Sequence, residues 1–230
     1  MYLARGVLNP ASRDVQRDLS DAAHLHRTIL KSFPNHVGGT PRKTLGVLYR
    51  VDENRRSAEL VLFVQSASRP DFTHLPPGYF ASSADDLDLA LQGDGNPRIR
   101  SLGQERAALT VGDRLVFRLQ ANATRKILTK SLADGTKQNG KRVPVRDDEA
   151  RLDWLRRHAE TAGFAVAEVR VSEVAKRTGM RGAARLTLAG ALFEGVLVVR
   201  DADLFRKALE SGIGPAKAYG YGLLSIHRAG

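Results

Sequence analysis

Apolar residues recur at the spacing of one helix face early in the chain, at Ala22, Leu25, Ile29 and Phe33. Positions three and four residues apart lie on the same side of an α-helix, so this stripe predicts a helix over 20–33 with a buried apolar face. Ser20 is expected to cap its first turn. Pro34 is expected to end it, because the residue before a proline disfavours helical backbone.

Most of the remaining pattern consists of strand-like runs, in which apolar residues alternate with polar ones or follow one another. The pattern predicts strands over 1–9, 44–51, 58–65, 113–122, 141–145, 164–171, 190–199 and 221–226. It also predicts helices over 148–163 and 201–212, and Asp201 and Gly212 are expected to cap the second of these. A short helix is expected over 83–91.

The order of these elements is β-α-β-β-(α)-β, followed by the same order again. It predicts an α+β protein of two tandem ferredoxin-like (RRM-like, βαββαβ) domains. We expect the first domain over 1–122 and the second over 147–230, with residues 123–146 as a basic segment between them. Seven cations give this segment its charge, against a single acidic residue, Asp134: Arg125, Lys126, Lys130, Lys137, Lys141, Arg142 and Arg146.

The chain as a whole is also positively charged. Its 36 Lys and Arg stand against 25 Asp and Glu, which gives a net charge of +11. Such a surplus favours a polyanionic partner, a nucleic acid in the first place and an anionic membrane in the second. A second positive stretch over 175–185 adds to this electrostatic footprint. The plainer alternative, that both stretches are solvated loops, stays open at this point.

Several function classes are disfavoured by what the sequence lacks. It has no apolar run of about 18 residues to span a bilayer and no signal-peptide pattern. It has no cysteine for a disulfide, a thiol nucleophile or a cysteine-built zinc site. We therefore expect a soluble, cytoplasmic protein. Zinc-finger and basic heptad signatures are missing, as is the aromatic RNP1 pattern, so a structured RNA read through its backbone fits better.

Glycines cluster near the end of the chain, in GIGPAKAYGYGLLSI (212–226): Gly212, Gly214, Gly220 and Gly222. A predicted helix precedes this run and a strand follows it. This is the reverse of the order in nucleotide phosphate loops, so nucleotide binding is disfavoured. Glycine permits close backbone approach, and N–H groups beside Lys217 can hold an RNA phosphate. The alternative is a helix cap followed by an edge strand weakened by glycine, and spacing alone does not decide between the two.

Three separated motifs carry a resemblance to a known family. They are MYLARGVLNPASRDVQRDLSDAAHLHRTILKSFP, then FRLQANATRK followed by GKRVPV, then ALFEGVLVV followed by the glycine run. Nearly end to end, the chain resembles the CasE-type CRISPR repeat endoribonucleases of the type I-E Cascade complex. The resemblance implies two ferredoxin-like domains that hold the hairpin of a CRISPR repeat, with other Cascade subunits as partners. It also implies cleavage at the 3′ base of that hairpin without metal or cofactor, after which the protein stays bound to the mature guide RNA (crRNA).

The same resemblance assigns His26 as the catalytic residue. The implied reaction is attack of a ribose 2′-OH on its neighbouring phosphate, which leaves a 2′,3′-cyclic phosphate. An imidazole with a reference pKa of about 6.5 can act as base or acid near neutral pH, and the sequence does not say which. Family members often carry a tyrosine where this chain has Ala23, so a second proton-transfer group is missing there. His24 lies on nearly the opposite side of the helix and is a poor substitute.

Basic side chains are expected to bind the RNA and to stabilise the charged transition state. The candidates are Lys126, Lys141, Arg142 and Lys217, together with the backbone of the four glycines. Arg156 and Arg157 can follow the hairpin backbone or can simply form the wet face of their helix. Three neighbouring carboxylates raise the idea of a metal-dependent nuclease, but such residues usually begin a helix: Asp85, Asp86 and Asp88.

The leading hypothesis is therefore a metal-independent endoribonuclease that processes CRISPR precursor RNA. Its main rival is an RNA-binding subunit that holds the hairpin without cutting it, and the alanine at position 23 keeps this rival open. A metal-dependent nuclease is disfavoured. So is a binder of anionic membranes, because no predicted helix concentrates its basic residues on one face.

Overall fold

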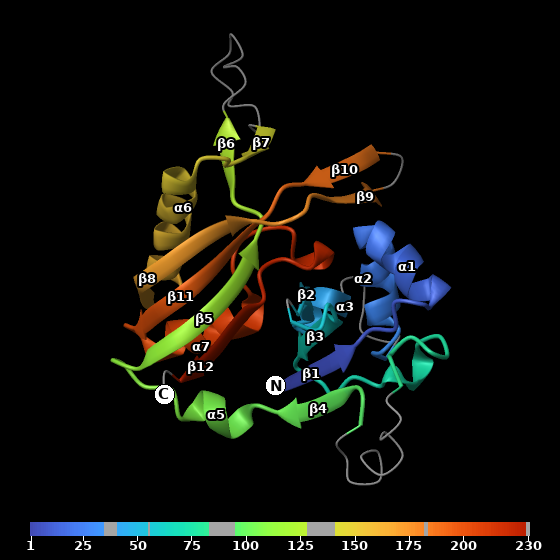
Figure 1. The fold of residues 1–230 in the computed structure, drawn as a ribbon. Helices are drawn as coiled ribbons and strands as arrows, with labels where there is room; N and C mark the ends of the chain where they lie inside the picture. The colour runs from blue at the N-terminus through green and yellow to red at the C-terminus, as the bar shows by residue number, and fades with distance from the viewer. Residues whose placement is uncertain (35–40, 55, 83–94, 128–140, 182–183, 229–230) are drawn as a thin grey trace.

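The structure is a computed structural model that describes residues 1–34, 41–54, 56–82, 95–127, 141–181 and 184–228. It contains two four-stranded antiparallel sheets, the first in the blue to green part of the chain and the second in the green to red part (Figure 1). Within those ranges, no helix is both long enough and apolar enough to cross a bilayer. The helix expected over 83–91 lies outside the described residues.

The first sheet has the strand order of a ferredoxin-like domain. It holds β1 (Tyr2–Val7), β2 (Leu48–Glu53), β3 (Leu60–Ser66) and β4 (Arg98–Ser101) in the order β2-β3-β1-β4. Between β1 and β2 lie α1 (Arg13–Ser20), α2 (Ala22–Leu30) and α3 (Pro41–Thr44), and η1 (Phe72–His74) follows β3. All four residues of the predicted helical stripe are buried, and Leu25 and Ile29 share one core cluster with Tyr49 and Val64 of the sheet.

The second sheet repeats this order. It holds β5 (Arg114–Ala121), β8 (Phe164–Glu173), β11 (Ala191–Val199) and β12 (Leu224–Arg228) in the order β12-β5-β11-β8. Its helices are α6 (Asp148–Thr161) and α7 (Ala202–Ser211), while α5 (Gly103–Ala107) leads from β4 into β5. Trp154 of α6 and Phe205 of α7 pack with Phe193 in the core of this sheet. The predicted fold, two tandem ferredoxin-like domains, is confirmed.

One strand lies in a different sheet from the one we expected. The predicted first domain, 1–122, ends with β5, but β5 pairs with β11 and β12. The first sheet is closed instead by β4, which pairs with β1. The predicted boundary at 122 is therefore wrong, because it places β5 in the first domain. The last strand of the first sheet ends at Ser101. Leu115, Phe117 and Leu119 are buried as their alternation predicts, yet alternation identifies a buried face and not the sheet that a strand joins.

The helix that carries His26 begins later than expected. Asp21 caps α2, since its carboxylate accepts a hydrogen bond from the N–H of Ala23 at 2.7 Å. Ser20 instead ends α1, where its hydroxyl donates to the carbonyl of Arg17 at 2.7 Å. The prediction of Ser20 as the cap is therefore wrong, and α1 is an additional helix that the apolar stripe does not reveal.

The two positive stretches form antiparallel ribbons. In one, β6 (Thr124–Ile127) pairs with β7 (Lys141–Pro144), and in the other, β9 (Arg177–Arg181) pairs with β10 (Ala184–Leu188). The β6–β7 ribbon extends beyond the second sheet, whereas β9–β10 reaches across to α1 and α2 (Figure 1). The interpretation of 175–185 as a solvated loop is therefore wrong, because this stretch is a strand pair that packs on the first domain.

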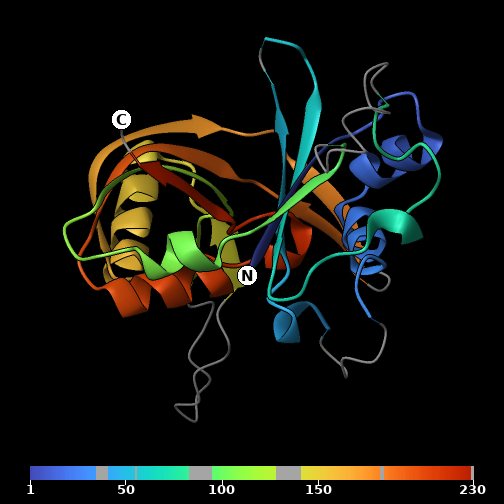
Figure 2. The ribbon, with the colours of Figure 1, turned by 90° about the horizontal axis from the view of Figure 1, so that it is seen from below.

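The two domains are joined by hydrogen bonds from buried side chains of the first sheet. The guanidinium of Arg50 is 2% exposed, pairs with Asp52 at 2.7 Å and donates to the carbonyl of Leu223 at 3.1 Å. The amide of Gln65 donates to the carbonyl of Leu209 at 2.6 Å. In the view from below, the N-terminus lies at the junction between the two groups of helices (Figure 2). The relative placement of the domains is thus fixed by contacts between particular groups.

Candidate active site

His26 lies on α2 at the margin of the buried stripe and is half-buried, as its helical position predicts. Leu25 and Ile29, on either side of it along the helix, are fully buried and fix the rotation of α2. The Nδ1 atom of His26 is itself buried and makes no hydrogen bond with any residue that the structure describes. The imidazole therefore has one ring nitrogen turned into the protein with no partner for its hydrogen or its lone pair.

Tyr49 of β2 connects His26 to the glycine-rich run. Its ring stacks against the imidazole with the centroids 6.2 Å apart and the planes 17° apart. Its hydroxyl donates to the carbonyl of Ala218 at 2.8 Å, inside η2 (Lys217–Tyr219). Burial raises the pKa of the Tyr49 phenol, so the hydroxyl keeps its proton and remains a donor. One fully buried side chain thus holds the helix and the run side by side.

Two cations border the same place. Lys217 begins η2, and Arg42 lies on α3, where its guanidinium donates to the carbonyl of Val47 at 3.4 Å. Burial, and after it the charge of Arg42, lowers the pKa of the Lys217 ammonium. Arg42 is also partly buried, which lowers its own pKa. Two like charges that are held together and partly desolvated form a place where an anion is stabilised.

The pKa of His26 is lowered from 6.5 to about 4, first by burial and then by the charges of Arg42 and Arg27. The imidazole is therefore neutral at physiological pH in the free protein. A neutral imidazole can take a proton from a hydroxyl but has none to spare for a leaving group. This arrangement favours the role of general base, a choice that the sequence leaves open.

Strand β9 braces both sides of the site. At Gly179 an added Cβ would lie 3.1 Å from the Asp21 carboxylate and 3.4 Å from the Ala23 nitrogen, so β9 approaches the start of α2 closely. Two positions earlier, Arg177 donates to the carbonyl of Tyr219 at 3.4 Å and lies over the ring of Tyr221, 5.7 Å from its centroid. The ribbon therefore holds α2 and the glycine-rich run in one arrangement.

Two of the four glycines fold the run back on itself. Gly212 ends α7 with φ of +75°, and its N–H donates to the carbonyl of Ala208 at 2.8 Å. The N–H of Gly222 donates to the carbonyl of Gln120 at 2.8 Å, and its own carbonyl accepts from Ile213 at 2.9 Å. Because these two N–H groups are already bonded, we assign Gly212 and Gly222 a folding role.

The other two glycines allow close packing. A Cβ at Gly214 would come within 2.7 Å of the Trp154 ring, and one at Gly220 would lie 2.6 Å from the Arg177 guanidinium and 3.1 Å from the Tyr49 ring. Gly220 is buried and Gly214 is half-exposed. Of the four glycines that were expected to contact RNA, Gly214 is thus the one left with open backbone.

The basic residues of the central segment are not brought to His26. Lys126 and Arg142 face each other across the β6–β7 ladder, and both are solvent-accessible. Lys141 pairs with Ile127 in the same ladder, and its side chain lies outside what the structure describes. The ribbon stands well apart from α2 (Figure 1). If these cations bind RNA, they contact a part of it remote from the reacting phosphate.

Arg156 and Arg157 lie still further away. Both are exposed on α6, on the far side of the second domain from α2 (Figure 1), and Arg156 pairs with Asp153 at 3.1 Å. This favours the wet-face interpretation. The acidic residues over 85–88 lie outside the described residues. Among those that are described, no cluster of three or more His, Asp or Glu side chains is arranged to hold a metal ion.

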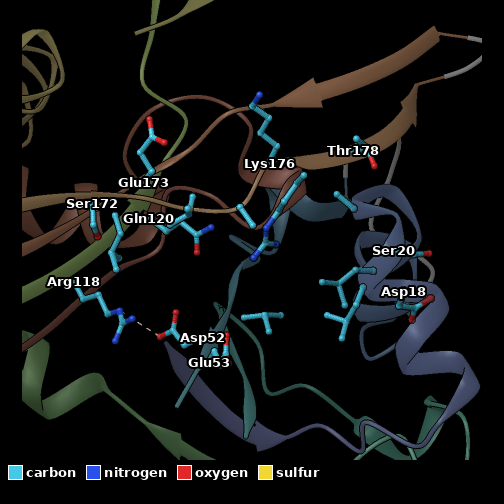
Figure 3. Close-up of a pocket in the computed structure, with 18 residues that line it drawn as sticks. Asp18, Ser20, Asp52, Glu53, Arg118, Gln120, Ser172, Glu173, Lys176 and Thr178 are labelled. Carbon is cyan, nitrogen blue, oxygen red and sulfur yellow. Dashed lines mark ion pairs between the residues drawn. The ribbon is translucent and has the colours of Figure 1, made fainter. Parts of the chain in front are cut away.

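A pocket of about 450 Å³ lies between the domains on the side of α1 and β9, and His26 does not line it (Figure 3). Its lining mixes both signs of charge. Arg118 lies beside Asp52, at 3.7 Å (Figure 3). The other charged residues of the lining are Asp18, Glu53, Glu173, Lys176 and Arg177. Because the charges nearly cancel, this pocket does not provide the positively lined trough that RNA needs.

Tyr49, Arg42 and Arg177 are the site residues that sequence reasoning misses. Tyr49 sits in a predicted strand, where it reads as an ordinary core residue. Arg177 belongs to the positive stretch over 175–185, in which the sequence does not single out any one residue. For Arg42 the one available signal is its place in a cationic pair with Lys43, just before that strand.

Comparisons with known proteins agree over the whole chain. A family model described as CRISPR associated protein matches residues 1–228. The chain is 29% identical to the CRISPR-associated endoribonuclease Cse3 of Thermus thermophilus, over 98% of this chain and 99% of that protein. It is 28% identical to the CRISPR system Cascade subunit CasE of Escherichia coli, over 98% of each. The structure of T. thermophilus Cse3 bound to an RNA representing a pre-cleavage complex matches with a TM-score of 0.73 and 31% identity, over 98% of each chain.

Proposed function

Because the chain belongs to the family of CRISPR-associated proteins, we propose that it is an endoribonuclease that cuts CRISPR precursor RNA at the 3′ base of the repeat hairpin. The cut needs no metal and leaves a 2′,3′-cyclic phosphate. The protein then stays on the mature guide RNA in the cytoplasm, as a subunit of Cascade. The similarity to Cse3, named an endoribonuclease, and to CasE, named a Cascade subunit, supports this proposal. The observation that carries it is the contact of Tyr49 with both His26 and the Ala218 carbonyl.

His26 acts as the general base. With a pKa of about 4 it is unprotonated near pH 7 and accepts the proton of the attacking 2′-OH. The 2′-oxygen then bonds to the adjacent phosphorus, and the bond from phosphorus to the 5′-oxygen of the next nucleotide breaks. That oxygen takes a proton from solvent, since position 23 carries an alanine and no hydroxyl. A positioned proton transfer of this kind contributes roughly 10²–10⁴-fold to the rate.

Arg42 and Lys217 stabilise the extra negative charge of the pentacoordinate phosphate. Burial lowers the pKa of Lys217 most, and the charge of Arg42 lowers it further, so the two cations already repel each other in the free protein. A phosphate between them relieves that repulsion and gains more as its charge grows, so the stabilisation is larger in the transition state than in the ground state.

The stem of the hairpin lies across the two basic ribbons. Both β6–β7 and β9–β10 project at the same end of the molecule, beyond the site on α2 (Figure 1). An RNA duplex is recognised mainly through its phosphates and its shape, and exposed cations such as Lys126 and Arg142 suit that recognition. With the stem on this side, its base comes to α2 and η2.

The function is tested by incubating the cognate repeat RNA in EDTA with the wild-type protein and with His26→Ala. We expect the wild-type protein to cut once and to leave a cyclic phosphate, and the variant to bind the RNA uncut. Inhibition by EDTA that added Mg²⁺ reverses would instead identify a metal-dependent nuclease.

The rival function, a hairpin-binding subunit that does not cut, is favoured by Ala23, because it leaves the site with a single proton-transfer group of the expected pair. The same experiment separates the two functions. RNA that stays intact with both proteins, yet is bound tightly by both, supports the rival.

A further inference from the structure

A cavity of about 630 Å³ opens at the domain junction beside the active site, on the side of α3 and α7. It is distinct from the mixed-charge pocket on the side of α1. Cations dominate its polar lining, whose main members are Arg42, Lys43, Thr44, Lys207, Glu210 and Lys217. Nothing in the reaction described above uses Lys43 or Lys207.

The charge of this cavity is more positive than the residue types alone suggest. Glu210 is the one carboxylate among the lining residues. It forms an ion pair at 2.7 Å with Arg106, which does not line the cavity. Lys43 and Lys207 are exposed and form no ion pair with any residue in the described part of the chain. Four cations therefore face the space with their charges uncompensated, an arrangement that binds anions.

The end of α7 opposes an anion in the cavity less than a free helix end would. The carbonyls at the end of α7 would repel a phosphate, but that of Leu209 accepts from the Gln65 amide at 2.6 Å and that of Ala208 from Gly212 at 2.8 Å. Two carbonyls at the negative end of the helix are thus occupied by donors from within the protein.

The position of the cavity relative to α2 indicates which part of the RNA reaches it. Arg42 and Lys217 both line this cavity, and the charge of Arg42 also acts on His26, so the cavity adjoins the site on α2. The basic ribbons that receive the stem lie at the opposite side of α2 from α3 and α7 (Figure 1). A strand that leaves the stem and passes His26 therefore reaches the cavity next.

We propose that this cavity binds the single-stranded RNA immediately 3′ of the scissile phosphate, with Lys43 and Lys207 on its phosphates. The inference rests on the proposed function, which places the cut at the 3′ base of the hairpin. Ligand sites of 300–1,000 Å³ hold molecules of about the size of a nucleotide, so the cavity has room for the first unit or two of this segment. Holding that segment also orients the departing 5′-oxygen opposite the attacking 2′-oxygen, which speeds the reaction.

The test compares two repeat hairpins, a short one that ends one nucleotide beyond the cut and a long one that extends about six nucleotides beyond it. A 2′-deoxy nucleotide at the attacking position keeps both uncut, so that the Kd can be measured at several salt concentrations. For the wild-type protein we expect the long RNA to bind about tenfold more tightly at low salt. We also expect its log Kd to change more steeply with log salt, by about 1.4 for two additional phosphates on a single strand.

The double variant Lys43→Ala/Lys207→Ala is expected to lose this gain, so that the long and short RNAs bind alike. Arg156→Ala/Arg157→Ala is the matched control, because it removes the same charge from exposed positions on α6 and should keep the tenfold gain. Equal loss in both variants, or equal binding of the two RNAs by the wild-type protein, overturns the inference.

Cleavage by the wild-type protein of the two RNAs with the natural 2′-OH tests the proposed function separately. If both are cut but bind alike, the cavity assignment fails and the proposed function stands. If neither is cut, the proposed function fails whatever the Kd values are.

Discussion

The ring of Tyr49 stacks on the imidazole of His26, and its hydroxyl donates to a carbonyl of the glycine-rich run. The stacking partner belongs to the first domain, whereas Ala218 lies between α7 and β12 of the second. The position of His26 relative to the glycine-rich run is therefore set at the junction between the domains.

Replacing Tyr49 by phenylalanine keeps the stacked ring and removes the hydroxyl. The partly buried Ala218 carbonyl then loses its donor, which should lower the free energy of unfolding by about 1–2 kcal/mol. We expect the single-turnover cleavage rate to fall about tenfold, because η2 and Lys217 are no longer held against α2, while the Kd for RNA changes little.

Tyr79→Phe is the matched control for this variant. Tyr79 is equally buried, and its hydroxyl donates to the Asp18 carboxylate at 3.0 Å, away from the site. It should lose stability to a similar or greater degree and keep the wild-type cleavage rate. A parallel fall of cleavage in both variants would mean that Tyr49 matters only for stability.

The titration of His26 gives a second prediction. In the free protein its imidazole should titrate near pH 4 in a proton NMR experiment, whereas Arg42→Ala should raise that pKa by removing a nearby positive charge. An RNA phosphate between Arg42 and Lys217 should raise it as well, since it adds negative charge. A pKa near 6.5 in the free protein would contradict the proposed electrostatics of the site.

The same shift predicts a dependence of stability on pH. Because the folded-state pKa lies below the unfolded value of 6.5, the unfolded chain binds the proton more readily. The contribution of His26 to stability is complete above pH 6.5 and is lost as the pH falls to about 4, by roughly 3 kcal/mol. Urea unfolding of the wild-type protein and of His26→Gln should therefore diverge across this window, with the variant losing less stability.

Gly220→Ala tests the close packing of the glycine-rich run. The residue has φ of +82°, and its new Cβ would collide with Arg177 and approach the Tyr49 ring. We expect a loss of stability above 2 kcal/mol and a strong fall in cleavage. Gly112→Ala is the control, since φ there is +92° but no atom lies within 4 Å of the Cβ. It should cost about 1–2 kcal/mol from backbone strain alone, with cleavage unchanged.

Lys126→Ala/Arg142→Ala should weaken RNA binding through the stem. The two side chains face each other on a ribbon that is remote from His26, so the effect should appear in Kd and not in the maximal rate. We expect the slope of log Kd against log salt to become shallower by about 1–2, as for the loss of one or two phosphate contacts. An unchanged slope would exclude the ribbon from the RNA interface.

How far the sequence predicts the fold and the site depends on the range of each interaction. The position of His26 follows from local spacing, because the stripe of Ala22, Leu25 and Ile29 fixes which side of α2 is buried. The hydrogen bond from Tyr49 to Ala218 spans 169 residues, and nothing local in either segment indicates it. The same reason explains the misplaced β5, since the apolar alternation of a strand does not specify its neighbours.

The resemblance to the CasE-type family predicts more about the site than the hydrophobic pattern of the sequence does. It supplies the reaction and the choice of His26, whereas the lowered pKa, which favours a base over an acid, requires the positions of Arg42 and Arg27 around the ring. For the glycine run, spacing leaves both a phosphate cradle and a folding role open. The bonded N–H groups of Gly212 and Gly222 favour the folding role.

Arg50 has a consequence for the protein as a whole. Its guanidinium is out of contact with water, and it bonds the carbonyl of Leu223 across the junction. Pulling the halves apart breaks this bond and the bond from Gln65 to the carbonyl of Leu209. The first contributes about 1.5–3 kcal/mol and the second about 0.5–1.5 kcal/mol to holding the halves together. The two halves should therefore melt in a single calorimetric transition, and neither should persist as a stable fragment. Because of this cooperativity, the arrangement of His26, Tyr49 and the glycine-rich run should persist on heating until the whole protein unfolds.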